Sequence, residues 1–318
     1  MNTKIAISLL IVFIIVFSLM FFLQYIVNDP TSVNEQNHPF YSKKFPENHN
    51  LVFIIGTSHV GQLNSTFINE EISSRFSNYE VYNLAHFKDN PQRREPYLDK
   101  ILEFNPTIVF YGISHREFKQ NSESNQNIIL NFQNGFSEIL SPEKFGFESI
   151  NPKFNTLQII RSFLDIPSMS IDDKMYDAYA PFFWYERPQT LISNEESLLR
   201  DDALITIDEY KIGDPTHNNQ VNVFKNIIQK LQDNNVKVVI FTTPLNHHYL
   251  NLIDKNEITT FNMILDEISN EFNVDVYDFT EKYEELSIWM NPTHISYNKN
   301  AIIVSQDIAN MIIQEIQE

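Results

Sequence analysis

Hydrophobic and polar residues alternate in blocks along most of the chain. Five apolar runs have the length of a buried strand, at residues 51–55, 79–85, 107–113, 236–244 and 274–280. Apolar residues recur at helical spacing in the stretches 91–104, 223–231, 261–272 and 297–316. Strands that alternate with helices are typical of a parallel sheet that is covered on both faces and joined by right-handed crossovers. The pattern therefore predicts a doubly wound α/β domain.

The alternation fails between about residues 119 and 216. This segment holds helix-like pieces and a cluster of aromatic residues at 176–185. Insertions of this size at the ligand end of a sheet often act as lids or substrate platforms. The aromatic residues would serve equally well as a small core of the insert itself, and both interpretations stay open.

The first apolar run of the chain is of a different kind. Ile5 to Val27 are 23 residues without a charge, which as a helix would reach about 35 Å at roughly 1.5 Å per residue. The run ends in bulky residues and has no small-x-small cleavage pattern, unlike a signal peptide. We therefore expect an uncleaved transmembrane anchor over residues 5–27, with the lipid bilayer as its partner.

A polar tether is expected after this anchor. Residues 28–50 contain three prolines and no periodicity, and the folded domain is expected over 51–318. Lys4 and the amino group are the positive charges before the apolar run, and Lys43 and Lys44 are the first after it. The positive-inside rule then favours a cytoplasmic N-terminus and an extracytoplasmic domain.

Charge and composition exclude several functions. A formal net charge of -18, with no basic cluster longer than Lys43-Lys44, disfavours nucleic-acid binding. The chain has no cysteine, which excludes disulfides, thiolate metal sites and a cysteine nucleophile.

Polar segments follow all five predicted strands. In an open parallel sheet, ligands bind beyond the carboxyl ends of the strands. Six of the nine histidines fall in these segments, namely His59, His86, His115, His247, His248 and His294. Scattered placement would not gather them there, so this edge is the expected working end of the domain.

A serine and a histidine at this edge fit nucleophilic catalysis. Ser58 follows the first strand, and its hydroxyl would need an imidazole to accept its proton. His294 lies in a loop before the last helix and is the natural base. Gly56 would allow a sharp turn, and amides at the start of the helix after Ser58 would bind the oxyanion.

A metal site is the alternative chemistry, because imidazole binds zinc and several first-row ions. However, the chain has no His-x-His, His-x-x-x-His or His-Glu-x-x-His spacing, and no carboxylate shares a motif with these histidines. We therefore assign no metal and no cofactor.

Three segments of the chain resemble the blocks of the SGNH/GDSL hydrolase superfamily. Residues 56–59, Gly-Thr-Ser-His, are similar to the Gly-Asp-Ser block, with Ser58 at the nucleophile position. Residues 112–115, Gly-Ile-Ser-His, resemble the Gly-x-Asn-Asp block, and residues 291–294, Asn-Pro-Thr-His, resemble the final Asp-x-x-His block. The resemblance implies that Ser114 is an oxyanion donor and that Asn291 orients His294.

The order of the blocks and their placement after strands match the superfamily over about residues 51–118 and 236–318. Individual residues within the blocks differ. The family's second block supplies a glycine amide, and its counterpart here is Ala85 or His86. Asn291 stands where the family has an aspartate, so it would accept the imidazole N–H without stabilising the positive charge. A carboxylate of Asp278, Glu284 or Glu285 would have to compensate, or a Ser–His dyad would act alone.

Four further residues at this edge are predicted to bind substrate. His59, His86 and His115 would line the pocket as hydrogen-bond donors, which suits a hydroxyl-rich or anionic substrate. Arg116 would clamp a carboxylate or pair with an acid of the fold.

Taken together, we expect a flavodoxin-like three-layer α/β/α fold with a five-stranded parallel sheet, a helical insert at 119–216 and an N-terminal transmembrane helix. The resemblance implies a serine esterase or O-acyltransferase that acts on acylated extracytoplasmic carbohydrate through an acyl-enzyme on Ser58. The alternatives are a non-catalytic surface protein that binds glycan or a partner on the same fold and, third, a histidine-rich metal-dependent hydrolase.

Overall fold

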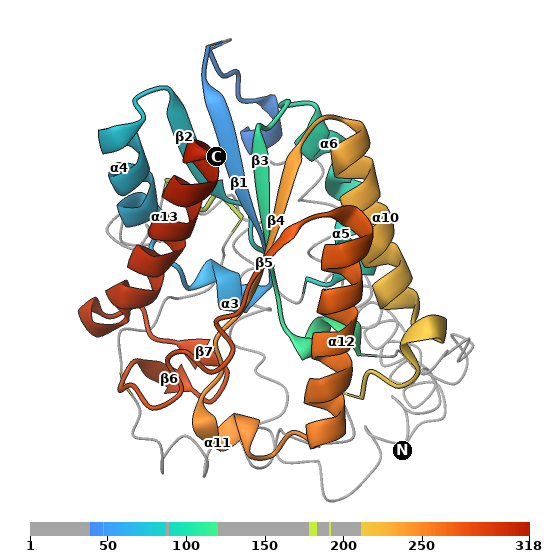
Figure 1. Ribbon diagram of the computed structural model, residues 1–318. Coiled ribbons are helices and arrows are strands. Elements are labelled where there is room, and N and C mark those ends of the chain that lie inside the picture. Colours follow the sequence, from blue (N-terminus) through green and yellow to red (C-terminus); the bar gives the residue numbers. More distant parts are fainter. Residues whose placement is uncertain (1–38, 47, 87–88, 120–177, 183–190, 192–210) are drawn as a thin grey trace, which may run out of the picture. The chain divides into compact units, whose positions relative to one another are not determined.

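The computed structural model describes residues 39–46, 48–86, 89–119, 178–182, 191 and 211–318 (Figure 1). The chain divides into two units, one of residues 1–43 and 126–170 and the other of residues 44–125 and 171–318. In the first unit the described part holds one short 3-10 helix, η1 (Pro39–Ser42). All that follows concerns the second unit.

Five parallel strands form the sheet of this unit, in the order β2-β1-β3-β4-β5. They are β1 (Asn50–Gly56), β2 (Tyr79–Asn83), β3 (Ile108–Ile113), β4 (Lys237–Thr242) and β5 (Asp275–Tyr277). The prediction of a five-stranded parallel sheet is confirmed, and this strand order is that of flavodoxin-like folds. Strand β5 is shorter than predicted. The N–H of Phe279 donates to the side-chain oxygen Thr242 Oγ1 instead of to a backbone carbonyl of β4, so the strand pairing ends before this residue.

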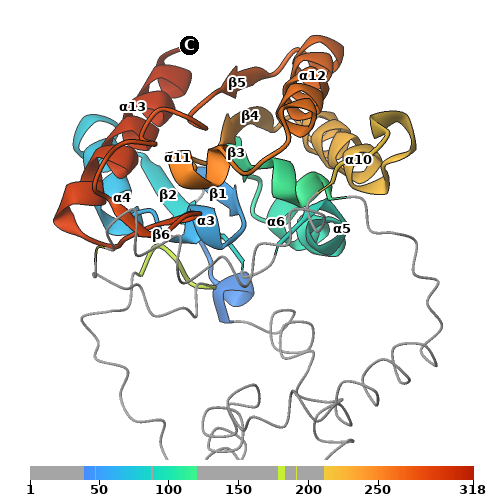
Figure 2. The ribbon, with the colours of Figure 1, turned by 90° about the horizontal axis from the view of Figure 1, so that it is seen from below.

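Helices cover both faces of the sheet. The longer ones are α4 (Ser65–Arg75), α10 (Asn219–Asp233), α12 (Lys255–Phe272) and α13 (Ile302–Gln317). The shorter ones are α3 (Ser58–Gly61), α5 (Pro91–Arg94), α6 (Leu98–Leu102), α11 (His247–Leu250), η2 (Glu95–Tyr97), η3 (His115–Phe118), η7 (Pro215–His217) and η8 (Lys299–Ala301). Figures 1 and 2 show α4 and α13 on one face, and α5, α6, α10 and α12 on the other.

Two local features differ from the predicted elements. The helix predicted over 91–104 is broken into α5, η2 and α6, since Pro96 in η2 has no N–H for a continuous helical ladder. The loop before the last helix contains a hairpin of β6 (Trp289–Asn291) and β7 (His294–Ile295), in which Asn291 pairs with His294. The carboxyl edge is therefore more ordered than the sequence indicates.

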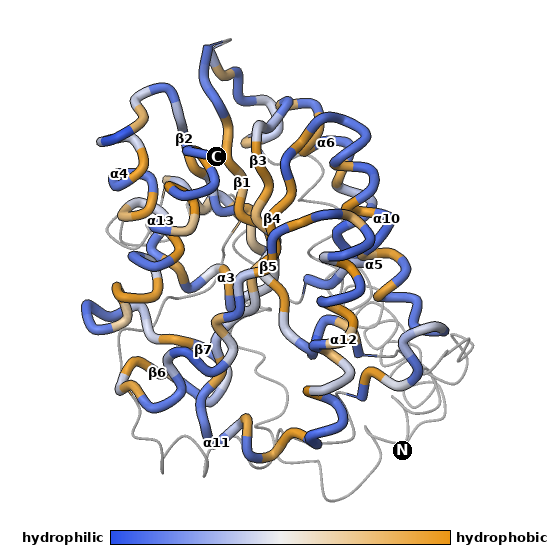
Figure 3. Tube along the Cα trace, viewed as in Figure 1, coloured by the Kyte–Doolittle hydropathy of each residue, from blue (hydrophilic) through white to orange (hydrophobic). Residues whose placement is uncertain are grey.

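The core consists of two apolar layers, one on each face of the sheet. Val52 and Ile54 of β1 belong to the buried cluster that includes residues of α4 and α13. Phe53 points to the other face, where its ring packs edge-on against Phe104, with centroids 5.9 Å apart. Figure 3 shows the apolar strands between helices whose outer surfaces are polar. Each fully buried large side chain stabilises the fold by roughly 1.5–3 kcal/mol.

The predicted anchor lies outside the described residues, as do most of the tether and most of the insert. Within the part of the chain that the structure describes, no helix has both the length and the apolar character needed to cross a bilayer.

Two glycines allow α3 to rest directly on the ends of two strands. Gly56 of β1 pairs with Gly112 of β3. A Cβ on Gly112 would lie 2.4 Å from Val60 Cγ2 and 2.5 Å from the Phe241 ring. A Cβ on Gly56 would lie 2.5 Å from the Gly112 carbonyl oxygen, and its φ of 147° is one that other residues rarely adopt. Any larger residue would push α3 away from the sheet.

We expect Gly112→Ala to lower the free energy of unfolding by about 1–3 kcal/mol, the usual cost of an overpacked core. Urea unfolding would measure it. In the double variant Gly112→Ala/Val60→Ala the loss should be smaller than the sum of the two single losses, because the clashing Cγ2 is gone. Strictly additive losses would contradict this packing.

Candidate active site

The end of β1 places Ser58 at the carboxyl edge of the sheet. Thr57 is the N-cap of α3, and its hydroxyl accepts a hydrogen bond from the N–H of His59 at 3.3 Å. Asn83, at the end of β2, donates from its side-chain amide to the carbonyl of Val60 at 2.8 Å and holds α3 against the neighbouring strand. Ser58 is the first residue of α3, and no described residue accepts a hydrogen bond from its N–H.

The hairpin of β6 and β7 brings His294 to Ser58. The two residues are 236 positions apart in the chain, and His294 Nε2 lies 2.8 Å from Ser58 Oγ. On the other side of the ring, Nδ1 is 3.1 Å from Asn291 Oδ1 and 3.0 Å from Thr293 Oγ1. The structure thus brings together Ser58, His294 and Asn291, the three residues that the sequence predicts for catalysis.

Hydrogen bonding assigns the tautomer of His294. Asn291 Oδ1 also accepts from the backbone N–H of Thr293 at 3.0 Å and of His294 at 2.8 Å, which identifies this atom as the amide oxygen. An oxygen that faces Nδ1 requires the proton on Nδ1. The lone pair of Nε2 then faces the Ser58 hydroxyl, which is the arrangement of a general base.

The charge state of His294 is set by burial. Burial, followed by the positive charge of Arg116, lowers the pKa of His294 to about 3. Among the described residues no carboxylate contacts the ring. Asp278 instead accepts from Thr242 Oγ1 at 2.6 Å, and the carboxylate of Glu285 lies 3.6 Å from His247 Nδ1. The compensating carboxylate considered from the sequence is therefore not supplied by Asp278 or Glu285, and His294 is neutral at neutral pH.

His59 and Arg116 lie beside this pair. His59 Nε2 is 3.4 Å from Arg116 Nη1 and, since a guanidinium only donates, Nε2 is the acceptor. The proton is then on Nδ1, 3.3 Å from Thr243 Oγ1. The rings of His59 and His294 meet edge-on with centroids 4.5 Å apart. Burial, then the neighbouring His294 and Arg116, lower the pKa of His59 well below its usual value.

The other two predicted substrate histidines are buried. His115 is 2% exposed and lies between the rings of Tyr249 and Phe261, at 5.9 and 6.4 Å. His115 is therefore packed among aromatic rings, and its role as a substrate-binding donor stays a prediction. The side chain of His86 is also buried, and its N–H donates to the carbonyl of Gly56 at 2.9 Å.

Two predicted oxyanion donors are engaged in internal bonds. The N–H of Ala85 donates to Asn83 Oδ1 at 3.0 Å. The Ser114 hydroxyl and the Ser114 N–H both bond to Glu117 Oε2, each at 2.6 Å, in a capping box that starts η3. In this arrangement the N–H of Ala85 and the hydroxyl and N–H of Ser114 are engaged within the protein. The amide of Ser58 is the predicted donor that remains.

Several supporting residues were missed in the sequence. Thr293 contacts His294, Thr243 contacts His59, and Glu117 holds Ser114. The Ser-x-x-Glu spacing of 114–117 is a readable capping signal. The two threonines carry no such signal, because their partners come from distant parts of the chain or from an unpredicted hairpin.

The edge histidines do not converge on one point. The group of potential metal-ligating side chains found among the described residues is Asp275, Glu315 and Glu318. Asp275 begins β5, at the opposite edge of the sheet from Ser58. The geometry at the carboxyl edge is that of a serine–histidine pair.

The chain is similar to several proteins of known structure. No family model matches the chain, and no curated protein matches it. An esterase from Pseudoalteromonas sp. is 10% identical, with a TM-score of 0.42, and the match covers 85% of this chain and 100% of the esterase. A lipase/acylhydrolase from Enterococcus faecalis is 9% identical, with a TM-score of 0.44 and coverage of 84% and 95%. A mutant acetylxylan esterase from Geobacillus stearothermophilus is 10% identical, with a TM-score of 0.42 and coverage of 86% and 96%.

By name, these matched structures are two esterases and a lipase/acylhydrolase. At this identity and TM-score, the activity of the present chain has to be inferred from its own site.

The tautomer and the charge state of His294 lead to a prediction for Asn291→Asp. A carboxylate of the same shape would accept the same N–H groups and would also stabilise the imidazolium, so the pKa of His294 should rise by about 1–3 units from about 3. Titration of the ring protons by NMR would measure it. Asn291→Leu is the control and should not raise the pKa. An unchanged pKa in Asn291→Asp would show that the side chain does not face Nδ1.

Proposed function

We propose that the protein is an SGNH/GDSL-type serine ester hydrolase. The observation that carries the proposal is the hydrogen bond of 2.8 Å between Ser58 Oγ and His294 Nε2 at the carboxyl edge of the sheet. Asn291 supports it by holding the proton on Nδ1, so that Nε2 is free to accept the proton of the serine.

The reaction follows from this geometry. Ser58 Oγ attacks the ester carbonyl carbon while its proton passes to His294 Nε2. The N–H of Ser58 donates to the oxyanion of the tetrahedral intermediate. The alcohol then leaves with the proton from His294, and an acyl-enzyme on Ser58 remains. Water, deprotonated by the same ring, releases the acid and restores the serine. A sugar hydroxyl in place of water would complete an acyl transfer.

His294 is a weak base in this site. Asn291 accepts the Nδ1 proton and so keeps the productive tautomer, but it carries no charge to stabilise the imidazolium that forms during the reaction. The positive charge of Arg116 also disfavours the imidazolium. We therefore expect slow turnover and a preference for esters with good leaving groups. The same weakness supports the second candidate function, a glycan-binding protein that keeps the fold of a hydrolase without its rate.

The proposed substrate is an acylated carbohydrate outside the cytoplasm. The resemblance of the three motifs implies this class. The polar residues around Ser58 suit a hydroxyl-rich molecule, and Arg116 suits one that carries a carboxylate.

A reactive phosphonate tests the nucleophile. A fluorophosphonate probe should label the protein once, on Ser58, because it reacts with an activated serine and mimics the tetrahedral intermediate. Ser58→Ala should abolish the labelling and His294→Ala should slow it by at least about 100-fold, the usual contribution of a general base. Intact-protein mass spectrometry would measure both. The neighbouring serine variant Ser65→Ala is the control. Labelling that persists in Ser58→Ala would rule out the proposed mechanism.

We further propose that the protein is a single-pass membrane protein with a cytoplasmic N-terminus and an extracytoplasmic domain. The uncharged run of residues 5–27 and the position of Lys4 support it. Protease added to intact cells, with the outer envelope removed where there is one, should digest residues 51–318 and spare the first residues. A domain that is degraded only after cell lysis would contradict this orientation.

A further inference from the structure

The helix that carries Ser58 is too short to set its own orientation. α3 has four residues, which is a single turn. Isolated helices shorter than about 12–15 residues are marginal in water, so contacts with the rest of the protein must hold a helix of this length. A contact that holds α3 also holds the Ser58 hydroxyl, which lies at hydrogen-bond distance from His294 Nε2.

Asn83, the last residue of β2, bonds to the backbone of α3. Its Nδ2 donates to the carbonyl oxygen of Val60 at 2.8 Å. Val60 follows Ser58 by two residues, a rise of about 3 Å along a helix. The side chain of Val60 packs closely over Gly112, where a Cβ would lie 2.4 Å from Val60 Cγ2. Asn83 therefore holds the carbonyl of a residue whose side chain already rests on the sheet.

Asn83 is itself held by two further hydrogen bonds. Its Oδ1 accepts from the N–H of Ala85 at 3.0 Å, and its own N–H donates to the carbonyl of Tyr179 at 2.6 Å. Tyr179 belongs to the described piece of the insert, 178–182, in which Ala180 and Phe182 are buried. Asn83 is 0% exposed, so it cannot touch a substrate. Any effect on a reaction has to pass through α3.

A carboxamide suits this position better than other side chains do. Asparagine is depleted in strands, and a buried amide is costly unless both of its ends are hydrogen-bonded. The Val60 carbonyl requires a donor and the Ala85 N–H requires an acceptor. The asparagine side chain offers both, whereas an ionised carboxylate only accepts. An apolar residue would fill the space and leave α3 without this bond.

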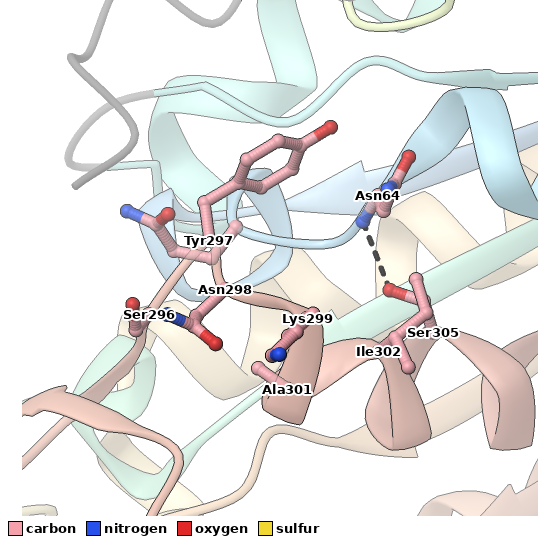
Figure 4. Close-up of a pocket in the computed structure, with 9 residues that line it drawn as sticks. Asn64, Ser296, Tyr297, Asn298, Lys299, Ala301, Ile302 and Ser305 are labelled. Atoms are coloured by element: carbon pink, nitrogen blue, oxygen red, sulfur yellow. Dashed lines mark hydrogen bonds between the residues drawn. The ribbon is translucent and has the colours of Figure 1, made fainter. Parts of the chain in front are cut away.

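The chain after α3 is attached separately. The N–H of Asn64 donates to Ser305 Oγ of α13 at 2.9 Å, in the wall of a cavity of about 520 Å³ that both residues line (Figure 4). Asn64 is the N-cap of α4, so this bond orients the beginning of α4. The bond from Asn83 acts on α3 itself.

We propose that Asn83 is a positioning residue for the nucleophile, which holds α3 so that the Ser58 hydroxyl keeps its hydrogen bond with His294. The term nucleophile rests on the proposed function. The effect of Asn83 on the contact between Ser58 and His294 does not, and it can be measured without turnover.

The first test measures this contact directly by NMR. The nitrogen chemical shift of His294 Nε2 reports whether this atom accepts a hydrogen bond, and Ser58→Ala gives its value without the bond. In Asn83→Ala the shift should move from the value of the unaltered protein toward that of Ser58→Ala. An unchanged shift would overturn the proposal. Asn83→Leu, which keeps the volume of the side chain, has the same expected result and decides if Asn83→Ala does not fold.

Asn69→Ala is the matched control. Asn69 is also a buried asparagine, and its Oδ1 accepts from the N–H of Val81 in the same strand at 2.9 Å. Both alanine variants should lower the free energy of unfolding, because each removes a buried hydrogen bond. The shift of His294 Nε2 should change in Asn83→Ala and stay constant in Asn69→Ala. Equal changes in the two variants would assign the effect to a general loosening of β2 and would overturn the proposal.

The rate of fluorophosphonate labelling separates this proposal from the proposed function. A displacement of about 1 Å at a reacting group can lower a rate about 100-fold, so Asn83→Ala should be labelled about 10- to 100-fold more slowly than the unaltered protein. Asn69→Ala should be labelled at the unaltered rate. An equal rate in Asn83→Ala would overturn the positioning role and leave the hydrolase standing. An unaltered protein that is not labelled would refute the hydrolase, and the shift of His294 would still decide on Asn83.

Discussion

The site depends on the close approach of α3 to the ends of β1 and β3. This approach requires the absence of a Cβ at both Gly56 and Gly112, because Val60 and the Gly112 carbonyl occupy that space. Once α3 lies there, Ser58 starts a helix directly above the sheet, with its N–H unpaired among the described residues and its hydroxyl 2.8 Å from His294. The positions of the proposed nucleophile and of its proposed oxyanion donor thus follow from one packing contact.

The electrostatics of the site follow from what surrounds the imidazole. Burial and Arg116 both lower the pKa of His294, and Asn291 does not oppose them with a charge. Asn291 nonetheless fixes the ring strongly, since its oxygen accepts from two backbone N–H groups as well as from Nδ1. The ring is therefore well oriented and weakly basic. In the proposed hydrolase, orientation without charge stabilisation would lower the rate.

The sequence predicted the elements whose signal is local. The five strands, the helices that cover them and the placement of Ser58 after the first strand follow from periodicity and from the positions of polar residues. The hairpin that carries His294 was missed because its strands, Trp289–Asn291 and His294–Ile295, are too short for a periodic pattern. The hydrogen bonds of Ser114 with Glu117 and of Ala85 with Asn83 depend on side-chain conformations. The spacing of these residues in the sequence does not determine those conformations.

In the proposed hydrolase, a weak base leaves more of the catalysis to the placement of the substrate. Binding energy from parts of a substrate remote from the reacting bond can fix the ester against the nucleophile, and correct positioning contributes several kcal/mol to a barrier. A truncated substrate would lose this contribution, whereas an enzyme with a strong base would depend on it less. In the proposed hydrolase, such remote contacts would give a physical reason for a chain to retain the Ser58–His294 hydrogen bond while an asparagine orients the histidine.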